Sequence, residues 1–342
     1  MKRRTALLGG VLLLAACSSV SGDVTTTRGS DAGTATTIEA GDSQLPAGFD
    51  VQGHRGARGL KPENTLPSFE TALDLGVSTL ELDLHYSADG DVVVWHDPVI
   101  DPDKCGLKPG APSHVPDPDD PATPEAALAV RSLTAADLRW FDCSRNPDPN
   151  TFPDQDSEAT LLAGDDFGIV TLDALIDFVE SYSTATSKTE LQKEGAGIVG
   201  YNVETKRGFG DPSAIDDGFD GTNAGPFELR LLEVIEDRQI RERVIVQSFI
   251  RESLEAIHRV DPKIRLAALT AGDADPGGYA ALGISVWSPM ASTISERRLA
   301  EAFEAGLAVI PWTVNSPEVV EALIAVGVDG VITDRPDLIL GP

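Results

Sequence analysis

Short apolar runs alternate along most of the chain with amphipathic stretches that have the period of an α-helix. The apolar runs are rich in Val, Ile and Leu, a composition typical of buried strands in a parallel sheet. The strands predicted in this way are Val51–His54, Thr79–His85, Ile198–Glu204, Val244–Ser248, Arg265–Leu269, Ile284–Trp287, Ala308–Thr313 and Gly330–Thr333. Most of them are followed by a helical stretch, so the chain alternates strand and helix.

The helical stretches carry apolar residues three or four positions apart, which predicts one face against a sheet. They are Pro67–Leu75, Leu172–Glu180, Phe227–Arg238, Ser253–Val260, Glu296–Ala305 and Pro317–Val326. Eight strands with intervening helices predict an α/β fold, a (β/α)8 TIM barrel; a doubly wound open sheet is the alternative. The barrel is favoured because polar residues fall at or near the C-terminal ends of strands, the face that carries the active site in this architecture. These residues are His54, Glu81, Asp83, Glu204, Gln247, Trp312 and Asp334.

The N-terminus has the pattern of an export signal. A basic Lys2-Arg3-Arg4 segment precedes an apolar run at positions 6–16, which is too short to span a bilayer comfortably. Leu14-Ala15-Ala16-Cys17 resembles the lipobox of bacterial lipoproteins. The resemblance implies a signal peptide over residues 1–16, lipidation of Cys17 and anchoring to the outer face of the bacterial membrane. An ordinary secretory signal with a chance cysteine is the alternative.

Two further segments stand apart from the barrel pattern. Residues 17–46, rich in Ser, Thr, Gly and Asp, predict a flexible tether before a domain at 47–342. Residues 101–166, after the second strand and its hairpin, are crowded with Pro and Asp, contain one predicted helix (Thr134–Trp140), and predict an insertion subdomain close to the site. It contains Cys105 and Cys143, whose even number in an exported chain indicates a disulfide; two free thiols are the alternative.

Composition narrows the classes of partner. Hydrophobic residues make up 41% of the 342 residues, which is enough for a sizeable core, and the formal net charge is -28. Such acidity argues against nucleic acid, because phosphate backbones are bound through clustered Lys and Arg. A small anionic substrate stays possible where a metal ion and local cations reverse the field inside a cleft.

The chemistry-bearing residues gather around one predicted strand. Glu81 and Asp83 are two apart, so both point to the same face. Two carboxylates facing one cavity repel each other unless one is protonated or a cation holds them. With Glu204 at the end of the next barrel strand, these hard oxygen donors predict one divalent ion, calcium or magnesium.

Two histidines and two cationic side chains complete this set. His54 and His96 each end a strand-like run and can exchange a proton near neutral pH. Arg55 offers a planar fork of donors for a phosphate. Lys206 follows Glu204 by two positions, shares its face and could place a charge on the same anion. The set predicts acid–base chemistry on a phosphate ester beside a bound cation.

In order and spacing, these residues resemble the glycerophosphodiester phosphodiesterase family from Val51 to Leu340, apart from the insertion. The motifs are His54-Arg55-Gly56, Pro62-Glu63-Asn64-Thr65, Glu81-x-Asp83, Asp89-Gly90, His96-Asp97, Glu204-Thr205-Lys206, Gln247-Ser248-Phe249, Trp312-Thr313-Val314-Asn315 and the segment from Asp329 to Pro336. Their combination carries the resemblance, since any single motif is weak.

The resemblance implies a metal-dependent barrel enzyme that cleaves glycerophosphodiesters to glycerol 3-phosphate and an alcohol. It implies that Glu81, Asp83 and Glu204 hold the metal, that His54 and His96 are the acid–base pair, and that Arg55 and Lys206 bind phosphate. Glu63, Asn64, Gln247 and Trp312 would brace the site or line the substrate pocket. A phosphodiesterase of the phospholipase D or sphingomyelinase D type and a non-catalytic glycerophosphodiester-binding lipoprotein are the alternatives; the sequence indicates neither the head group nor the oligomeric state.

Overall fold

The computed structural model of the protein describes residues 45–208 and 215–341, and eight parallel strands form its centre. Their order in the sheet is β10-β9-β8-β7-β6-β2-β1-β11. Their bounds are β1 (Asp50–Gly53), β2 (Thr79–Tyr86), β6 (Gly200–Thr205), β7 (Val244–Ser248), β8 (Arg265–Thr270), β9 (Val286–Pro289), β10 (Ala308–Val309) and β11 (Gly330–Thr333). Backbone hydrogen bonds from Asp329 N to Val309 O and from Ile332 N to Pro311 O, both 2.9 Å, join the two ends of this sheet. The strands therefore form a TIM barrel, as the sequence predicts.

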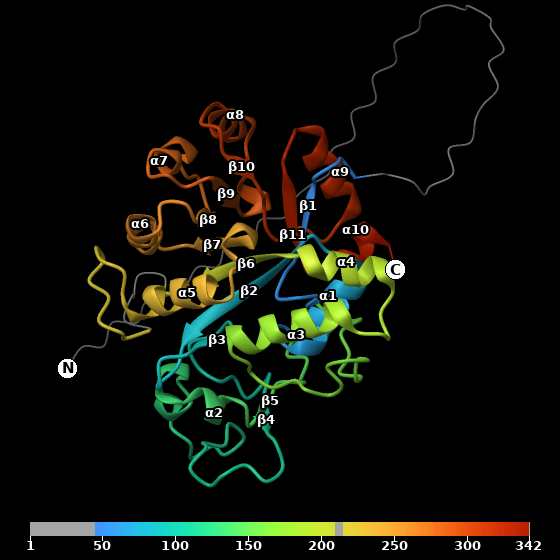
Figure 1. Ribbon diagram of the computed structural model, residues 1–342, viewed down its shortest axis with the longest axis vertical. Helices are drawn as coiled ribbons and strands as arrows, with labels where there is room; N and C mark the ends of the chain where they lie inside the picture. The colour runs from blue at the N-terminus through green and yellow to red at the C-terminus, as the bar shows by residue number, and fades with distance from the viewer. Residues whose placement is uncertain (1–44, 209–214, 342) are drawn as a thin grey trace, which may run out of the picture. The chain divides into compact units, whose positions relative to one another are not determined.

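Helices cover the outside of the strands (Figure 1). They are α1 (Leu66–Leu75), α3 (Leu172–Thr184), α4 (Glu190–Ile198), α5 (Pro226–Asp237), α6 (Arg251–Val260), α7 (Pro276–Ala280), α8 (Glu296–Glu304), α9 (Pro317–Ala325) and α10 (Pro336–Leu340). The first of them shows how local sequence sets the bounds. Thr65 caps its N-terminus, Pro67 sits in its first turn, and Gly76 ends it at φ +80°, a conformation that favours glycine.

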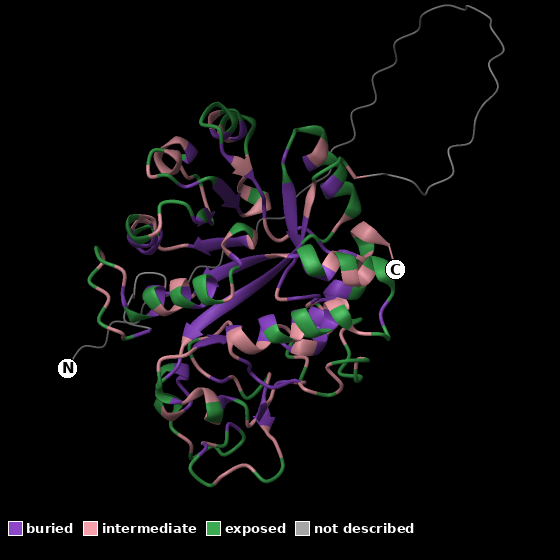
Figure 2. Ribbon diagram, viewed as in Figure 1, coloured by how far each residue is buried: buried purple, intermediate pink, exposed green. Residues whose placement is uncertain are grey.

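Apolar side chains pack on both sides of the strands. Outside the barrel, residues such as Leu80, Leu82 and Leu84 of β2 pack against the helices. A small cluster lies among the strands, including Ile245, Ala267 and Ile332. Figure 2 shows the consequence, with buried strands surrounded by helices whose outer faces are exposed.

The insertion after β2 has its own core. The strand β3 (Val92–Val94) returns antiparallel to β2, and the chain then forms β4 (Gly106–Leu107), α2 (Ala135–Leu138) and β5 (Phe141–Asp142). β4 pairs antiparallel with β5, and a disulfide joins Cys105 to Cys143 beside this pair. A cluster containing Trp95, Ile100 and both cysteines fills the space between the insertion and the barrel. The predicted stapling of the insertion is thus present.

Several predicted boundaries differ from the structure. Ile198 is the last residue of α4, so the predicted strand Ile198–Glu204 begins later. The regular strand covers only Ala308–Val309 of the predicted Ala308–Thr313, and Trp312 adds an isolated parallel bridge to Met290. The predicted strand Ile284–Trp287 begins at Val286. Helices α4, α7 and α10 were not predicted.

The predicted signal peptide at 1–16, Cys17 and nearly all of the predicted tether at 17–46 lie outside the described residues. Among the residues that the structure describes, no helix combines the length and the apolar character needed to cross a bilayer.

Candidate active site

A cavity of about 190 Å³ opens at the C-terminal ends of the barrel strands. Its wall contains residues delivered by β2, β6, β7, β8 and β11 and by the loops that follow the strands. They are His54, Arg55, Glu81, His96, Glu204, Lys206, Gln247, Phe249, Leu269, Trp312 and Ile332. Most of the predicted site residues therefore line one space, on the barrel face where the sequence places them.

Three carboxylates meet at this cavity. Asp83 of β2 is the register partner of Glu204 on the neighbouring strand β6, and Glu81 points the same way two residues earlier. Each offers an oxygen within 4.8 Å of the others, and all three residues are buried. The parallel pairing of two consecutive barrel strands thus creates the cluster.

Burial and mutual repulsion set the charges of the cluster. Burial, with the nearby charge of Asp83, raises the pKa of Glu81 well above its usual range. Burial likewise raises the pKa of Glu204 to about 7, although Lys206 opposes this. For Asp83 burial acts in the same direction, but Arg55 and Lys206 outweigh it and hold its pKa well below the usual value. Three full negative charges are therefore not accommodated here without an added cation.

The donor set fits a hard divalent cation. Oδ1 of Asp83 is buried and has no hydrogen-bond partner within the described residues. Glu81 is oriented by the side-chain amide of Gln247, 2.6 Å from its Oε1, and by the backbone N–H of Arg55, 3.0 Å from its Oε2. A set of donors made only of carboxylate oxygens suits calcium or magnesium.

His54 follows β1 and is held by Asp334, which follows β11. Nδ1 of His54 lies 2.6 Å from Oδ1 of Asp334. The other ring nitrogen, Nε2, lies 3.9 Å from the Glu81 carboxylate at the cavity. Burial lowers the pKa of His54 to about 4 despite the nearby Asp334 charge, so the ring is neutral at neutral pH. With Nδ1 engaged, Nε2 is the nitrogen free to exchange a proton.

His96 repeats this arrangement on the opposite side of the cluster. Its Nδ1 lies 2.7 Å from Oδ1 of the adjacent Asp97. Hydrogen bonds from His96 and Lys104 outweigh the effect of burial and lower the pKa of Asp97 to about 2. Each histidine is thus paired through Nδ1 with an ionised carboxylate.

Arg55 and Lys206 supply positive charge beside the carboxylates. Nε of Arg55 is 3.1 Å from Asp83, and its Nη1 is 2.8 Å from Glu63. Nζ of Lys206 is 2.9 Å from Glu204 and 3.6 Å from Asp83. Arg55 has φ +53°, an uncommon conformation for a non-glycine residue, and this turns its backbone N–H toward the cluster.

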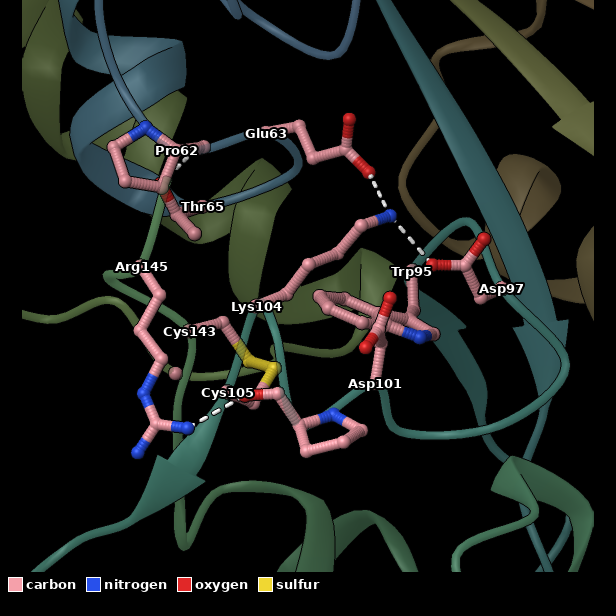
Figure 3. The surroundings of a disulfide bond; sticks show 12 residues. Pro62, Glu63, Thr65, Trp95, Asp97, Asp101, Lys104, Cys105, Cys143 and Arg145 are labelled. Atoms are coloured by element: carbon pink, nitrogen blue, oxygen red, sulfur yellow. Dashed lines mark hydrogen bonds and ion pairs between the residues drawn. A yellow bond between two sulfur atoms is a disulfide. The ribbon is translucent and has the colours of Figure 1, made fainter. Parts of the chain in front are cut away.

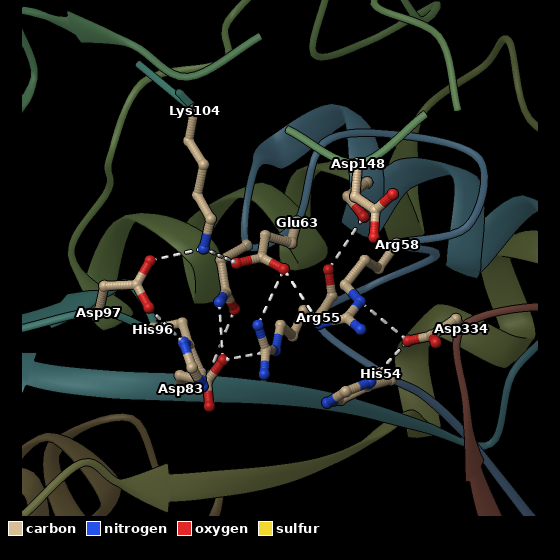
Figure 4. A network of polar contacts seen from close by, with 12 residues as sticks. His54, Arg55, Arg58, Glu63, Asp83, His96, Asp97, Lys104, Asp148 and Asp334 are labelled. Carbon is tan, nitrogen blue, oxygen red and sulfur yellow. Dashed lines mark hydrogen bonds and ion pairs between the residues drawn. The ribbon is translucent and has the colours of Figure 1, made fainter. Parts of the chain in front are cut away.

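The predicted supporting residues contact this set in different ways. Asn64, also left-handed at φ +58°, donates from Nδ2 to Asp83 Oδ2 at 2.8 Å. Glu63 pairs with Arg55, and Figure 4 shows this contact together with the pairs that surround both histidines. Trp312 stacks edge-on against Phe249 with ring centres 5.5 Å apart, and both rings line the cavity.

The structure adds residues to which the sequence gave no role. Asp334 was placed at a strand end, but nothing in the sequence pairs it with His54, 280 positions away. Arg58, in the loop after β1, lies 3.0 Å from Asp334. Lys104 reaches the site from the insertion. Inside the barrel, Asn202 donates to Gln52 (2.6 Å) and to Gln247 (3.0 Å), continuing the polar chain that ends at Glu81. For Asn202 and Gln52, which were not predicted, the available signal was a polar residue on an otherwise apolar strand.

The barrel and this cavity define a candidate enzyme site, with two histidines beside a carboxylate cluster that could hold a metal. The chain matches the Glycerophosphoryl diester phosphodiesterase family over residues 54–206 and 219–338. It therefore belongs to that family and is a phosphoric diester hydrolase.

Individual relatives agree with this assignment. A glycerophosphodiester phosphodiesterase of Caldanaerobacter subterraneus is 25% identical over 85% of this chain and 96% of its own length. One of Bacillus altitudinis is 27% identical over 83% of this chain and 94% of its own length.

Solved structures show the same architecture. A putative glycerophosphoryl diester phosphodiesterase from Silicibacter pomeroyi has a TM-score of 0.67 at 26% identity, covering 85% of this chain and 92% of that one. An Oleispira antarctica phosphodiesterase, solved in complex with the product sn-glycerol-3-phosphate, has a TM-score of 0.60 at 19% identity, covering 85% and 94%. At that identity the second likeness concerns the fold.

Proposed function

We propose that the protein hydrolyses glycerophosphodiesters to glycerol 3-phosphate and an alcohol, using one divalent ion held by Glu81, Asp83 and Glu204. The observation that carries the proposal is the meeting of these carboxylates with His54 and His96 around one cavity, in a chain of this family. The product complex of the Oleispira phosphodiesterase supports the same class of small substrate.

The ion is calcium or magnesium in this proposal. When bound, it supplies positive charge that stabilises the phosphoryl oxygens and lets the carboxylates remain ionised. The raised pKa of Glu81 and of Glu204, both caused chiefly by burial, is the property that such a cation reverses.

The protein's own groups bind and orient the diester. Arg55 and Lys206 line the cavity and attract the phosphate, and the carboxylates around them restrict the side-chain positions. Trp312 and Phe249 provide apolar walls, against which the glycerol carbons or the leaving alcohol can pack.

Proton transfer is assigned to the two histidines. One takes the proton of the attacking hydroxyl through Nε2 as the new P–O bond forms, and the other gives a proton to the departing alkoxide as the old P–O bond breaks. The family resemblance suggests that the glycerol hydroxyl of the substrate attacks first, giving a cyclic phosphate that water then opens with the proton roles reversed. Asp334 and Asp97 hold the rings by their Nδ1 atoms.

The test is a panel of glycerophosphodiesters assayed with chelated, calcium-loaded and magnesium-loaded enzyme. We expect turnover to disappear with the chelator and to return with one of the ions, while sphingomyelin and lysophospholipid remain uncleaved. His54→Ala and His96→Ala should each lower the rate by orders of magnitude while the fold is kept. Cleavage of sphingomyelin alone would indicate the related phospholipase D type, and binding without phosphate or alcohol release would indicate a binding protein.

We further propose that Cys17 is lipidated and anchors the enzyme to the outer face of a bacterial membrane. The basic, apolar and lipobox-like segments of the N-terminus support this location, and two or more acyl chains on one residue give stable anchoring. Cys17→Ser should release the enzyme from the membrane fraction, and an unchanged distribution between membrane and soluble fractions would oppose the assignment.

A further inference from the structure

The insertion reaches the active site through a single lysine beside its disulfide. Nζ of Lys104 lies 2.5 Å from Oδ2 of Asp97 and 2.9 Å from Oε1 of Glu63 (Figure 3). The side chain is 16% exposed and runs beside the Trp95 ring, with Nζ 5.7 Å from the ring centre. Its ammonium group therefore joins the loop after β3 to the loop after β1.

Each of these carboxylates uses its second oxygen for a site residue. Oδ1 of Asp97 is 2.7 Å from Nδ1 of His96, and Oε2 of Glu63 is 2.8 Å from Nη1 of Arg55. Lys104 thus occupies the centre of a relay that ends at His96 on one side and at Arg55 on the other. Figure 4 shows both arms of the relay.

The relay matters because the carboxylates need a countercharge. Oxygens of Glu63 and Asp97 and a ring nitrogen of His96 lie within 4.8 Å of one another. Without Lys104, no cation would lie between Asp97 and Glu63. Asp97 would then lose the ion pair that fixes its carboxylate beside His96, whereas Glu63 would keep Arg55 and Arg58 but lose the contact at its Oε1. A shift of about 1 Å in a catalytic group can cost 100-fold in rate.

The disulfide holds the backbone of Lys104. Cys105 is bonded to Cys143, and both are buried. The backbone N of Arg145, two residues after Cys143, donates to Lys104 O at 3.2 Å, and Lys104 N donates to Asp101 O at 3.0 Å. The flanking strands pair over only two residues each, and so short a ladder is marginal by itself.

We propose that Lys104 is a positioning residue for His96 and Arg55, and that the Cys105–Cys143 disulfide keeps it in place, so that turnover depends on the thiol–disulfide state of the insertion. The inference rests on the proposed function. Reduction by a dithiol transfers two electrons and two protons to the bridge, giving two cysteine thiols and the cyclic disulfide of the reagent. The end of the β4–β5 pair then opens and Lys104 leaves both carboxylates.

The first test compares Lys104→Ala with Lys104→Arg, which keeps the charge. We expect Lys104→Ala to lose roughly 10- to 100-fold in kcat/KM, the range seen when groups that orient a site residue are removed. Lys104→Arg should recover most of this loss, and added ethylammonium should partly restore Lys104→Ala. Lys108→Ala is the matched control, because Lys108 lies in the same insertion and pairs with Asp166 at 3.2 Å. Loss of stability without rescue by the amine would reduce Lys104 to a structural role and overturn the proposal.

The second test asks whether the bridge acts through Lys104. The double variant Cys105→Ser/Cys143→Ser should match the loss of Lys104→Ala, and combining all three changes should add little, because both act on one relay. Near-UV circular dichroism and the melting of each variant show whether the barrel stays folded. Independent, multiplying losses, or full activity of the serine variant with a folded barrel, would overturn the link to the disulfide.

Wild-type enzyme assayed in parallel distinguishes a failure of the proposed function from a failure of the proposed role of Lys104. If wild type hydrolyses no glycerophosphodiester under any metal condition, the proposed function fails. If wild type is active and Lys104→Ala is equally active, the proposed function stands and only this inference is rejected.

Discussion

Replacing Asp334 by asparagine is expected to slow turnover by weakening the hold on His54. Oδ1 of Asp334 faces two donors, Nδ1 of His54 at 2.6 Å and Nε of Arg58 at 3.0 Å. Oδ2 accepts from Nδ2 of Asn315 at 2.8 Å. Asparagine has the same shape but only one oxygen, so it cannot accept on both sides.

The conflict has two outcomes, and both reduce activity. If the new oxygen faces His54, the NH2 group meets the amide NH2 of Asn315, whose own oxygen is already used by the backbone N–H of residue 334 at 2.8 Å. If the NH2 group faces His54, it donates to Nδ1 and places the ring proton on Nε2, where a base is needed. The loss of a charge-assisted hydrogen bond is worth about 1.5–3 kcal/mol, which corresponds to about a 10- to 150-fold lower kcat/KM.

The assay is alcohol release from glycerophosphocholine at saturating metal, with Asp337→Asn as control. Asp337 lies in the same segment but pairs with Arg335 at 2.9 and 2.8 Å, away from the cavity. The control should keep near wild-type activity. An Asp334→Asn enzyme with more than half of wild-type kcat/KM would refute the reasoning that this carboxylate orients His54.

Three further outcomes follow from the same contacts. Glu81→Gln should weaken metal binding by about 10- to 100-fold in a calorimetric titration, and an unchanged affinity would remove Glu81 from the ligand set. Asn202→Leu removes the amide group that donates to Gln52 and Gln247, so two buried acceptors lose their hydrogen bonds. The free energy of unfolding, measured in urea, should fall by about 2–6 kcal/mol. A loss below about 1 kcal/mol, the smallest cost of one unsatisfied acceptor, would contradict this. Burial opposes ionisation of Glu70, but its hydrogen bond from Lys188 (2.6 Å) and other hydrogen bonds lower its pKa. The ionised carboxylate therefore stabilises the fold at neutral pH, and this contribution should be lost as the pH is lowered below about 4. Glu70→Gln should flatten this acid limb in pH-dependent unfolding, and an unchanged limb would show that other groups cause it.

The barrel could be predicted from the sequence because its strands are apolar runs bounded by turns. Val244–Ser248 and Gly330–Thr333 match their predicted limits. The sequence of α4 carries two glycines and few apolar residues, so its periodicity is weak, and its capping box at Thr189 was the remaining local signal. Its last residue, Ile198, extends into an apolar run and was mistaken for a strand start.

The sequence predicts only those parts of the site that follow from strand alternation and from the order of neighbouring strands. Strand alternation places Glu81 and Asp83 on one face, and parallel neighbours bring Glu204 to them. The partner of His54 comes from the other end of the chain, and the closure of the barrel alone brings it near. Lys104 belongs to an irregular insertion whose path has no periodic signal, so neither its position nor its partners could be deduced.

Anomalous diffraction from crystals soaked in manganese tests the central claim most directly, because it locates the ion without relying on activity. The account predicts a strong peak roughly 2.0–2.6 Å from carboxylate oxygens of Glu81, Asp83 and Glu204, the range found for hard divalent ions. A map with no peak at these carboxylates, at a manganese concentration that supports turnover, would contradict it.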